Sequence, residues 1–322
     1  MKRLSIATWN MENLDDSDAP AWNIRRGIMR NILERIDADV MLLQEINKVS
    51  ALNDLRNGTF CQNYHIAHTK TAAGTPYAKR NLVVLSRWPI TSVKQYKNEK
   101  VPAPMWKKAT AMPAATQAQE IVWERPILHA EIALNGKTLH AINIHLKSFP
   151  PSPIEGQIDP QNTYRWLSHA GWAEGYYISD IKRVGQALET RVLIDTIFSQ
   201  HGNDSLVVVG GDYNADIGSV PFKTIVGSVD DTSNPDLRPR VLIPCELNVP
   251  SSQRFSLLHR GKGNMIDHIA VSQEFYPRWR STVIFNELLP DKSIAFATML
   301  KFPESDHAPV IARFDVPDSW IT

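Results

Sequence analysis

Short, continuous apolar runs constrain the fold of this chain more than any other feature of its sequence. Residues 40–43, 82–85 and 206–209 contain no polar side chain, and such runs are typical of β-strands that are buried on both faces. Residues 20–36 instead carry isoleucine at every fourth position from Ile24 to Ile36, with a proline in the first turn, which predicts an amphipathic helix. Strands covered on both faces need a further layer of sheet or helix on each side.

Further strands are predicted between residues 4 and 314. The sequence Asn135-Gly136 separates two alternating runs and is a strong signal for a two-residue hairpin. Apolar residues at helical spacing predict a second long helix over residues 180–198. The remaining predicted strands are residues 4–9, 127–134, 137–146, 266–271 and 309–314. Because strands outnumber helices and hairpins mix with helical crossovers, we expect an α/β sandwich of two sheets flanked by helices.

Composition excludes several classes of protein. The 322 residues include 35 Lys+Arg and 34 Asp+Glu, with 43% hydrophobic residues, which is too apolar and too little charged for a disordered chain. No apolar run approaches the roughly 20 residues of a membrane-spanning helix. The 2 cysteines exclude a disulfide framework. The N-terminal residues lack the apolar segment of a signal peptide, so we expect a cytoplasmic protein. Nothing indicates an obligate protein partner, so we expect a monomer.

Two proline- and tryptophan-rich segments interrupt the pattern. Residues 101–113 and 149–177 are predicted to be long loops, and long loops in compact domains are often functional. Their tryptophans have two interpretations, as packing residues or as surfaces that stack on nucleic-acid bases. No internal repeat or linker divides the chain, so we expect one domain over residues 1–322 with these two loop insertions.

Polar clusters follow the predicted strands at their carboxyl ends. One Asp or Asn in such a place commonly forms a turn, but the repetition predicts a ligand site, because ligand sites gather at strand ends. Carboxylate and amide ligands without cysteine suit Mg²⁺, Mn²⁺ or Ca²⁺ better than zinc. The clusters are residues 9–13, 44–45, 143–145, 211–214 and 305–307.

These clusters resemble, in order, the motifs of the endonuclease/exonuclease/phosphatase superfamily, which includes deoxyribonuclease I and the exonuclease III type of apurinic endonuclease. The resemblance extends over nearly the whole chain. It implies a four-layered α/β sandwich and a divalent-metal-dependent hydrolysis of a phosphoester. The matching segments are residues 6–10, 41–45, 143–146, 211–214, 265–268 and 305–309.

The resemblance also implies roles for individual residues. Glu45 would be the principal ligand of Mg²⁺ or Mn²⁺, with Asn10 and Asp306, and Glu12 would join the outer shell. Asp212 would hold or deprotonate the attacking water, and Asn214 would position that water or bind a phosphate oxygen. The remaining implied roles are His307 paired with Asp267, His145 as donor to the phosphate or the leaving oxygen, and Arg125 as a phosphate contact.

The chemistry of phosphodiester cleavage agrees with this set, because the site must cancel charge, place a water and support the leaving oxygen. His307 and Asp212 are both candidates for the base. Asp267 has a second interpretation as a turn cap, and Arg125 has one as a surface ion-pair residue.

The substrate is less constrained than the reaction. The segments 77–80, 124–126 and 214–220 are closest to deoxyribonuclease I, although Lys79 stands where that nuclease has an acidic partner for its histidine. Basic residues in the loops favour a polyanion. We therefore expect an endonuclease that hydrolyses DNA by metal-assisted in-line attack of water, with RNA as a candidate second substrate. The alternatives are a phosphodiesterase or phosphatase acting on a lipid or small phosphoester, and a binding module without activity.

Overall fold

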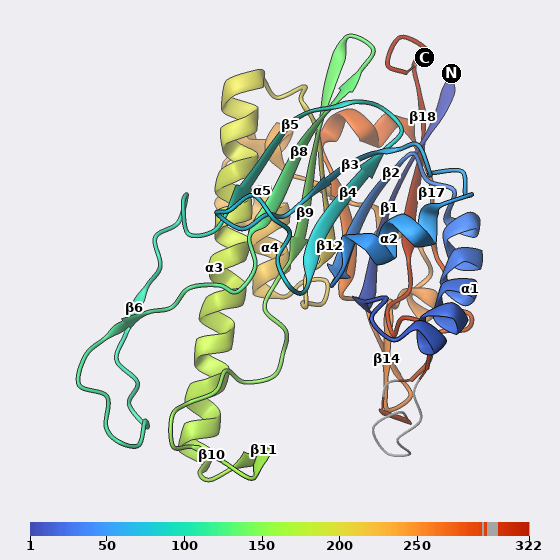
Figure 1. The fold of residues 1–322 in the computed structure, drawn as a ribbon. Coiled ribbons are helices and arrows are strands. Elements are labelled where there is room, and N and C mark those ends of the chain that lie inside the picture. Colours follow the sequence, from blue (N-terminus) through green and yellow to red (C-terminus); the bar gives the residue numbers. More distant parts are fainter. Residues whose placement is uncertain (292, 295–301, 322) are drawn as a thin grey trace.

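The computed structural model describes residues 1–291, 293–294 and 302–321. Within these residues, two six-stranded sheets lie face to face and helices cover their outer sides (Figure 1). The expected four-layered α/β sandwich is confirmed. None of the described helices is long and apolar enough to cross a membrane.

The first sheet has the strand order β17-β18-β1-β2-β4-β3. Helices α1 and α2 cover its outer face, where Trp22 and Leu33 pack against Trp9 and Met41. The parallel strands β1 and β2 are joined through α1. The bounds are β1 (Lys2–Leu14), α1 (Ala19–Ile36), β2 (Val40–Ile46), α2 (Val49–Arg56), β3 (His65–His68), β4 (Asn81–Ser86), β17 (Trp279–Ile284) and β18 (Val310–Val316).

The second sheet has the order β13-β16-β12-β9-β8-β5. Helices α3 and α4 cover its outer face. The strands are β5 (Ile90–Tyr96), β8 (Ile127–Leu134), β9 (Lys137–His145), β12 (Leu206–Asp212), β13 (Ile243–Pro244) and β16 (Asp267–Val271). The helices that follow β9 are α3 (His169–His201), α4 (Val220–Val226), α5 (Val229–Thr232) and the 3₁₀ turns η1 (Pro235–Arg240), η2 (Cys245–Asn248), η3 (Ser251–Gln253) and η4 (Gln273–Arg278).

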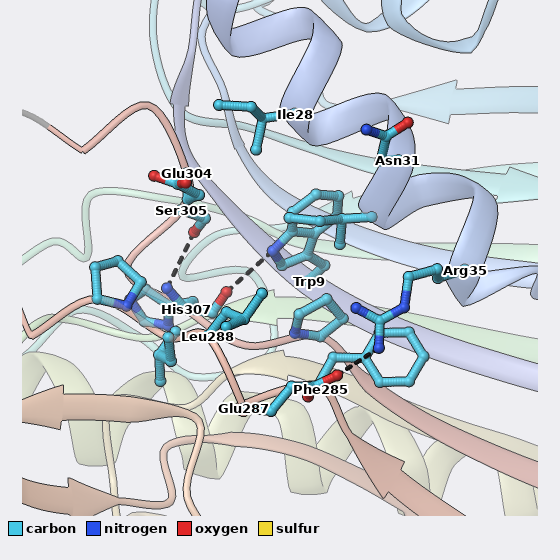
Figure 2. A pocket seen from close by; sticks show the side chains of 14 residues that line it. Trp9, Ile28, Asn31, Arg35, Phe285, Glu287, Leu288, Glu304, Ser305 and His307 are labelled. Carbon is cyan, nitrogen blue, oxygen red and sulfur yellow. Dashed lines mark hydrogen bonds and ion pairs between the residues drawn. The ribbon is translucent and has the colours of Figure 1, made fainter.

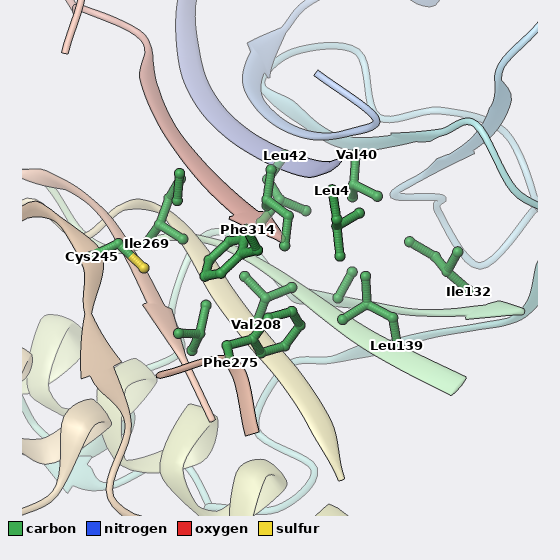
Figure 3. Close-up of a cluster of buried hydrophobic side chains, with 14 of the residues drawn as sticks. Leu4, Val40, Leu42, Ile132, Leu139, Val208, Cys245, Ile269, Phe275 and Phe314 are labelled. Carbon is green, nitrogen blue, oxygen red and sulfur yellow. The ribbon is translucent and has the colours of Figure 1, made fainter. Parts of the chain in front are cut away.

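The apolar residues between the two sheets form the main core (Figure 3). Side chains alternate along each strand, so Leu4 and Ile6 of β1 face the second sheet while Ala7 and Trp9 face α1. The runs 40–43 and 206–209 are continuous because each strand is covered on both sides, as the sequence predicts.

The predicted hairpin is also confirmed. Leu134 lies opposite Lys137 across the two-residue turn, and Gly136 has a φ of 73°, a conformation that glycine adopts without steric cost. The helix predicted over residues 20–36 forms as α1, but its buried face differs from the expected one. Ile24 is 64% exposed, whereas Trp22 and Met29 are buried.

The second predicted loop is partly wrong, because residues 169–177 are the first turns of α3. This end of α3 extends past the sheets, and the segments around β6, β10 and β11 lie beside it (Figure 1). We call residues 101–123 and 149–177 the arm. Its strand pairs are β6 (Met105–Trp106) with β7 (Gln119–Glu120) and β10 (Ile158–Asp159) with β11 (Asn162–Trp166); a third pair, β14 (Leu257–His259) with β15 (Lys262–Asn264), lies outside it.

Two buried carboxylates of α3 accept hydrogen bonds from the arm and from the residues that precede it. Glu174 accepts hydrogen bonds from the indole of Trp106 and from the amides of Ala109 and Thr110. Glu189 accepts from the amides of residues 98–100 and from the indole of Trp123. The arm is therefore fastened to a helix whose other half packs on the second sheet.

Candidate active site

Three side chains of the site come from neighbouring strands of the second sheet. The ladder places Asp212 at the end of β12 opposite His145 of β9 on one side and opposite Asp267 of β16 on the other. A glycine precedes Asp212 for a steric reason, because a Cβ on Gly211 (φ 148°) would lie 1.9 Å from the carbonyl oxygen of Ile144. The register alone therefore brings these three groups together.

The first sheet supplies the other half of the site. Asn10 and Glu12 belong to β1, Glu45 to β2, and Asp306 precedes β18. The amide of Asp306 donates to Glu12 Oε2 at 3.0 Å. Asn10 Nδ2 donates to Asp212 Oδ2 at 3.1 Å, which joins the two sheets at the site.

His307 and Asp267 form a buried pair. Nδ1 of His307 donates to Oδ2 of Asp267 at 2.7 Å. Burial by itself lowers the pKa of His307, but Asp267, with the nearby charges of Asp212 and Asp306, raises it to about 10. Burial also raises the pKa of Asp267, yet we place the proton on His307 because several carboxylates surround it. His307 is therefore an imidazolium at neutral pH.

The segment that carries His307 is fixed from both sides. Ser305 Oγ donates to the carbonyl of Asn10 at 2.6 Å and accepts from the amide of His307 at 3.0 Å. The indole of Trp9 donates to the His307 carbonyl at 3.1 Å. Figure 2 shows the contacts of His307 with Ser305 and Trp9 in a pocket on the α1 side of the segment, which is also lined by Ile28 and Phe285.

Asp212 is ionised although it is buried. Its Oδ1 accepts from the amide of Asn214 at 2.8 Å. Burial raises the pKa of Asp212, but the neighbouring His145, the imidazolium of His307 and the amide of Asn214 hold that pKa well below its ordinary value. Asn214 has a φ of 45°, and its Nδ2 donates to the carbonyl of Leu146 at 3.1 Å. The strained turn thus keeps Asn214 beside Asp212.

His145 lies between Arg125 and two carboxylates. Its Nε2 is 2.8 Å from a guanidinium nitrogen of Arg125, 3.3 Å from Asp212 Oδ2 and 3.7 Å from Glu45 Oε1. Burial and the charge of Arg125 lower the pKa of His145, so a neutral ring accepts the hydrogen bond from Arg125. Within the described residues, Nδ1 of His145 has no hydrogen-bond partner, which agrees with Lys79 standing in place of an acidic residue.

Arg125 is a buried residue of the site and not a surface ion-pair residue. It is 7% exposed, and burial lowers its pKa, whereas Glu45 and Glu124 raise it. Gln186 of α3 holds the chain here, because its Nε2 donates to the carbonyl of Arg125 at 3.1 Å and its Oε1 accepts from the amide of Lys147 at 2.9 Å. Sequence reasoning missed Gln186, which lies in an ordinary helical pattern.

A second residue that the sequence did not reveal is Arg25 of α1. It donates to the carbonyls of Met11 at 2.7 Å and Glu12 at 2.6 Å. Burial lowers its pKa, and the charges of Glu12, Asp306 and Glu45 raise it, so the guanidinium lies within the electrostatic field of these carboxylates. Glu12 and Glu45 have φ values of 41° and 58°, and Arg25 holds the first of these strained residues in place.

The donor set fits a hard divalent cation. Glu45, Glu12 and Asp306 supply carboxylate oxygens and Asn10 an amide oxygen, the ligand types that Mg²⁺ and Mn²⁺ prefer. A separate group, Asp212, Asp267 and His307, has ligand atoms that all lie within 4.8 Å of one another, but the protonated His307 is an ion-pair partner and no ligand. Every site residue predicted from the sequence lies in this one region at the end of the two sheets.

Two of the basic loop residues that were expected to contact a polyanion instead bind groups within the protein. Nζ of Lys147 donates to the carbonyls of Ser148 and Pro150, and Lys108 pairs with Glu155 at 2.7 Å. The ring of Trp166 lies against Gly175 of α3. Trp172 is 44% exposed and meets Tyr176 edge to face. Of the expected substrate-binding tryptophans, Trp172 is the most open to a ligand.

Comparisons with known proteins agree with the fold. Residues 7–116 match the Endonuclease/Exonuclease/phosphatase family. A truncated TDP2 from Caenorhabditis elegans is similar in structure, with 15% identity, 98% of each chain covered and a TM-score of 0.56. No curated protein matches in sequence.

Two further solved structures are similar at low identity. A mannosyl-6-phosphatase from Bacteroides thetaiotaomicron has 15% identity, covers 97% of this chain and 100% of its own, and has a TM-score of 0.57. A 3′ phosphatase from Neisseria, bound to a product DNA hairpin, has 17% identity, the same coverage of 97% and 100%, and a TM-score of 0.55. Residues 7–116 thus match the endonuclease/exonuclease/phosphatase family, and the whole chain shares the fold of these solved structures, in agreement with the resemblance in the sequence.

Proposed function

We propose that this protein is a Mg²⁺- or Mn²⁺-dependent phosphodiesterase that hydrolyses DNA. The observation that carries the proposal is the convergence of oppositely charged groups in one site. The imidazolium of His307 and the guanidinium of Arg125 lie beside the ionised Asp212 and an oxygen-rich set of ligands. Hydrolysis of a phosphodiester requires both kinds of group, because a negative substrate must be neutralised while a water is activated.

Glu45, Asn10 and Asp306, with Glu12, would hold the divalent cation. When bound, it would polarise the phosphoryl group and lower the charge that an attacking water meets.

Asp212 is the better of the two candidates for the base. It is ionised, and its position is fixed by Asn10 on Oδ2 and by the amide of Asn214 on Oδ1. A carboxylate held in this way orients the attacking water and takes its proton as the bond to phosphorus forms. His307 holds a proton at neutral pH and therefore cannot accept one.

His307 instead donates. Its Nδ1 is engaged with Asp267, which leaves the Nε2 proton for an oxygen of the phosphate. The pair fixes both the ring orientation and the charge, as in other His–Asp arrangements. Arg125 supplies a second positive group, and the neutral His145 orients it through the hydrogen bond to Nε2.

Nucleic acid is the substrate class that the surface favours. Trp172 and Tyr176 offer exposed rings on the arm, and a ring that stacks on a base contributes about 1–3 kcal/mol. The similar Neisseria structure holds DNA. The alternative is a small phosphoester. It is favoured by the internal contacts of Lys108 and Lys147, which remove two cations from the expected polyanion surface.

A nicking assay tests the proposal. Supercoiled plasmid is incubated with the protein in Mg²⁺, Mn²⁺ or EDTA, beside a lipid phosphodiester, a sugar phosphate and a small chromogenic phosphodiester. We expect nicking with either metal, none with EDTA and none by His307→Ala, while the exposed-histidine control His259→Ala keeps full activity. If a small phosphoester is cleaved while the plasmid stays intact, the result contradicts DNA as the substrate and supports the small phosphoester.

A further inference from the structure

A cluster of histidines lies on the outer face of the second sheet. His129 of β8 and His140 of β9 are 4% and 3% exposed, and His201 is the last residue of α3. Because side chains alternate along a strand, His140 and the active-site residue His145 point to opposite faces of the sheet. They are also separated by about 17 Å along β9, at roughly 3.3 Å per residue. The cluster is therefore distinct from the candidate active site.

The side chains of the cluster are close enough to share one ion. Nε2 of His129 is 3.1 Å from Nδ1 of His140, and the ligand atoms of these two residues and of Glu131 all lie within 4.8 Å of one another. The ring of His201 lies 5.0 Å from that of His140, centroid to centroid. Two nitrogen ligands bonded to a tetrahedral zinc ion at about 2.0–2.1 Å are about 3.3 Å apart.

The surroundings of the cluster are unusual for a structural role. Among the described residues, the side chains of His129 and His140 hydrogen-bond only to each other, although Leu128 and Ile142 beside them are packed in apolar cores. Burial lowers the pKa of His129 to about 3 and that of His140 to about 4, so both rings are neutral and keep lone pairs for a ligand.

The neighbouring charges are mixed. Lys94 lies opposite His129 in the ladder, and its charge and that of Lys100 act against a cation at His129. Lys94 is exposed, and its flexible side chain can turn toward solvent. The carboxylate of Glu131 and the C-terminal end of the α3 dipole act in the opposite sense.

We propose that His129, Glu131, His140 and His201 form a binding site for a transition-metal ion of the Zn²⁺ class. Imidazole ligands select such an ion over Mg²⁺, which prefers oxygen. Rotation of the two buried rings exchanges their mutual hydrogen bond for bonds to the ion. The bound ion fastens the end of α3 to β8 and β9, and so stabilises the face of the sheet opposite the active site.

Equilibrium dialysis against Zn²⁺ in excess Mg²⁺ tests this site, with metal counted by atomic spectrometry. We expect His140→Ala to bind one equivalent less than the wild type. His201→Ala changes an exposed helix end and leaves the fold intact. We expect it to bind the ion at least about tenfold more weakly, since even residues that only orient a metal ligand contribute that much. The control is His65→Ala, an exposed histidine on β3.

The melting temperature gives a second readout that does not depend on hydrolysis. Zn²⁺ raises it for the wild type and for His65→Ala, because a ligand that binds only the folded state stabilises it, and raises it less for His201→Ala. Zinc binding by both cluster variants equal to that of His65→Ala would overturn the proposal, as would a wild type that retains no zinc.

Discussion

Replacing Asp267 by Asn removes the carboxylate that keeps His307 protonated. The pKa of His307 is raised from 6.5 to about 10, and at about 1.36 kcal/mol per unit this is a preference on the order of 5 kcal/mol for the charged ring. Asp267 is the largest favourable contributor, while burial opposes the charge. Without Asp267, we expect the pKa of His307 to fall below about 7, so that at most about a tenth of the protein is protonated at pH 8.

The assay is the rate of hydrolysis of a small phosphodiester at saturating Mg²⁺ from pH 6 to pH 10. The wild type should keep its activity until the pH approaches the pKa of His307, about 10. Asp267→Asn should lose at least about tenfold at pH 8 and recover part of that loss as the pH is lowered. An NMR titration of the His307 ring follows the same change directly, and Asp216→Asn, an exposed residue near the site, is the control.

Stability provides a separate check. Because the pKa of His307 is raised in the folded state, its contribution is fully present below about pH 6.5 and is lost as the pH rises through about 10. The wild type should therefore lose unfolding free energy over this range, and Asp267→Asn should lose less. Identical activity profiles and an unchanged His307 titration in the variant would refute the assignment of the pair.

Three further predictions follow from the site and the arm. Glu45→Gln should require more metal for half-maximal rate, whereas His307→Ala should lower the rate at saturating metal; equal metal titrations would contradict this division of roles. Trp172→Ala should slow cleavage of a long polynucleotide but not of a small phosphodiester, whereas the packed Trp166→Ala should slow both and lower the melting temperature. Loss of both activities in both variants would contradict a nucleic-acid-binding surface on the arm. Glu189→Gln should destabilise the fold by about 3 kcal/mol in a denaturant titration, since the buried carboxylate of Glu189 accepts four hydrogen bonds. An exposed-residue control, Glu120→Gln, should change nothing.

The sequence predicted those parts of the fold that depend on local pattern. The hairpin formed because Asn135-Gly136 determines its own turn, and the buried strands formed because their apolar runs need two covering layers. The edge strands β5 and β17 were missed, because partly exposed edge strands mix polar and apolar residues. The start of α3 was missed because prolines and the glycines Gly171 and Gly175 obscure the helical pattern.

That the candidate residues lie together was predictable from the sequence, but their geometry was not. Motifs identify Asp212 and His145, whereas their contact depends on the register of β9 and β12, which long-range packing determines. The same limit explains the residues that were missed. Arg25 and Gln186 act through backbone carbonyls and amides, and nothing in a helical sequence indicates which backbone groups a side chain will meet.

We propose that one site carries out metal-dependent phosphoester hydrolysis and that Asp212 is the group that activates water. The most direct measurement is the single-turnover rate of phosphodiester cleavage by Asp212→Asn at saturating Mg²⁺, compared with that of the matched control Asp216→Asn. We expect Asp216→Asn to equal the wild type and Asp212→Asn to lose at least about a hundredfold in rate, the usual contribution of a positioned acid or base. Equal rates for the two variants, or full activity of the wild type in EDTA, would contradict it.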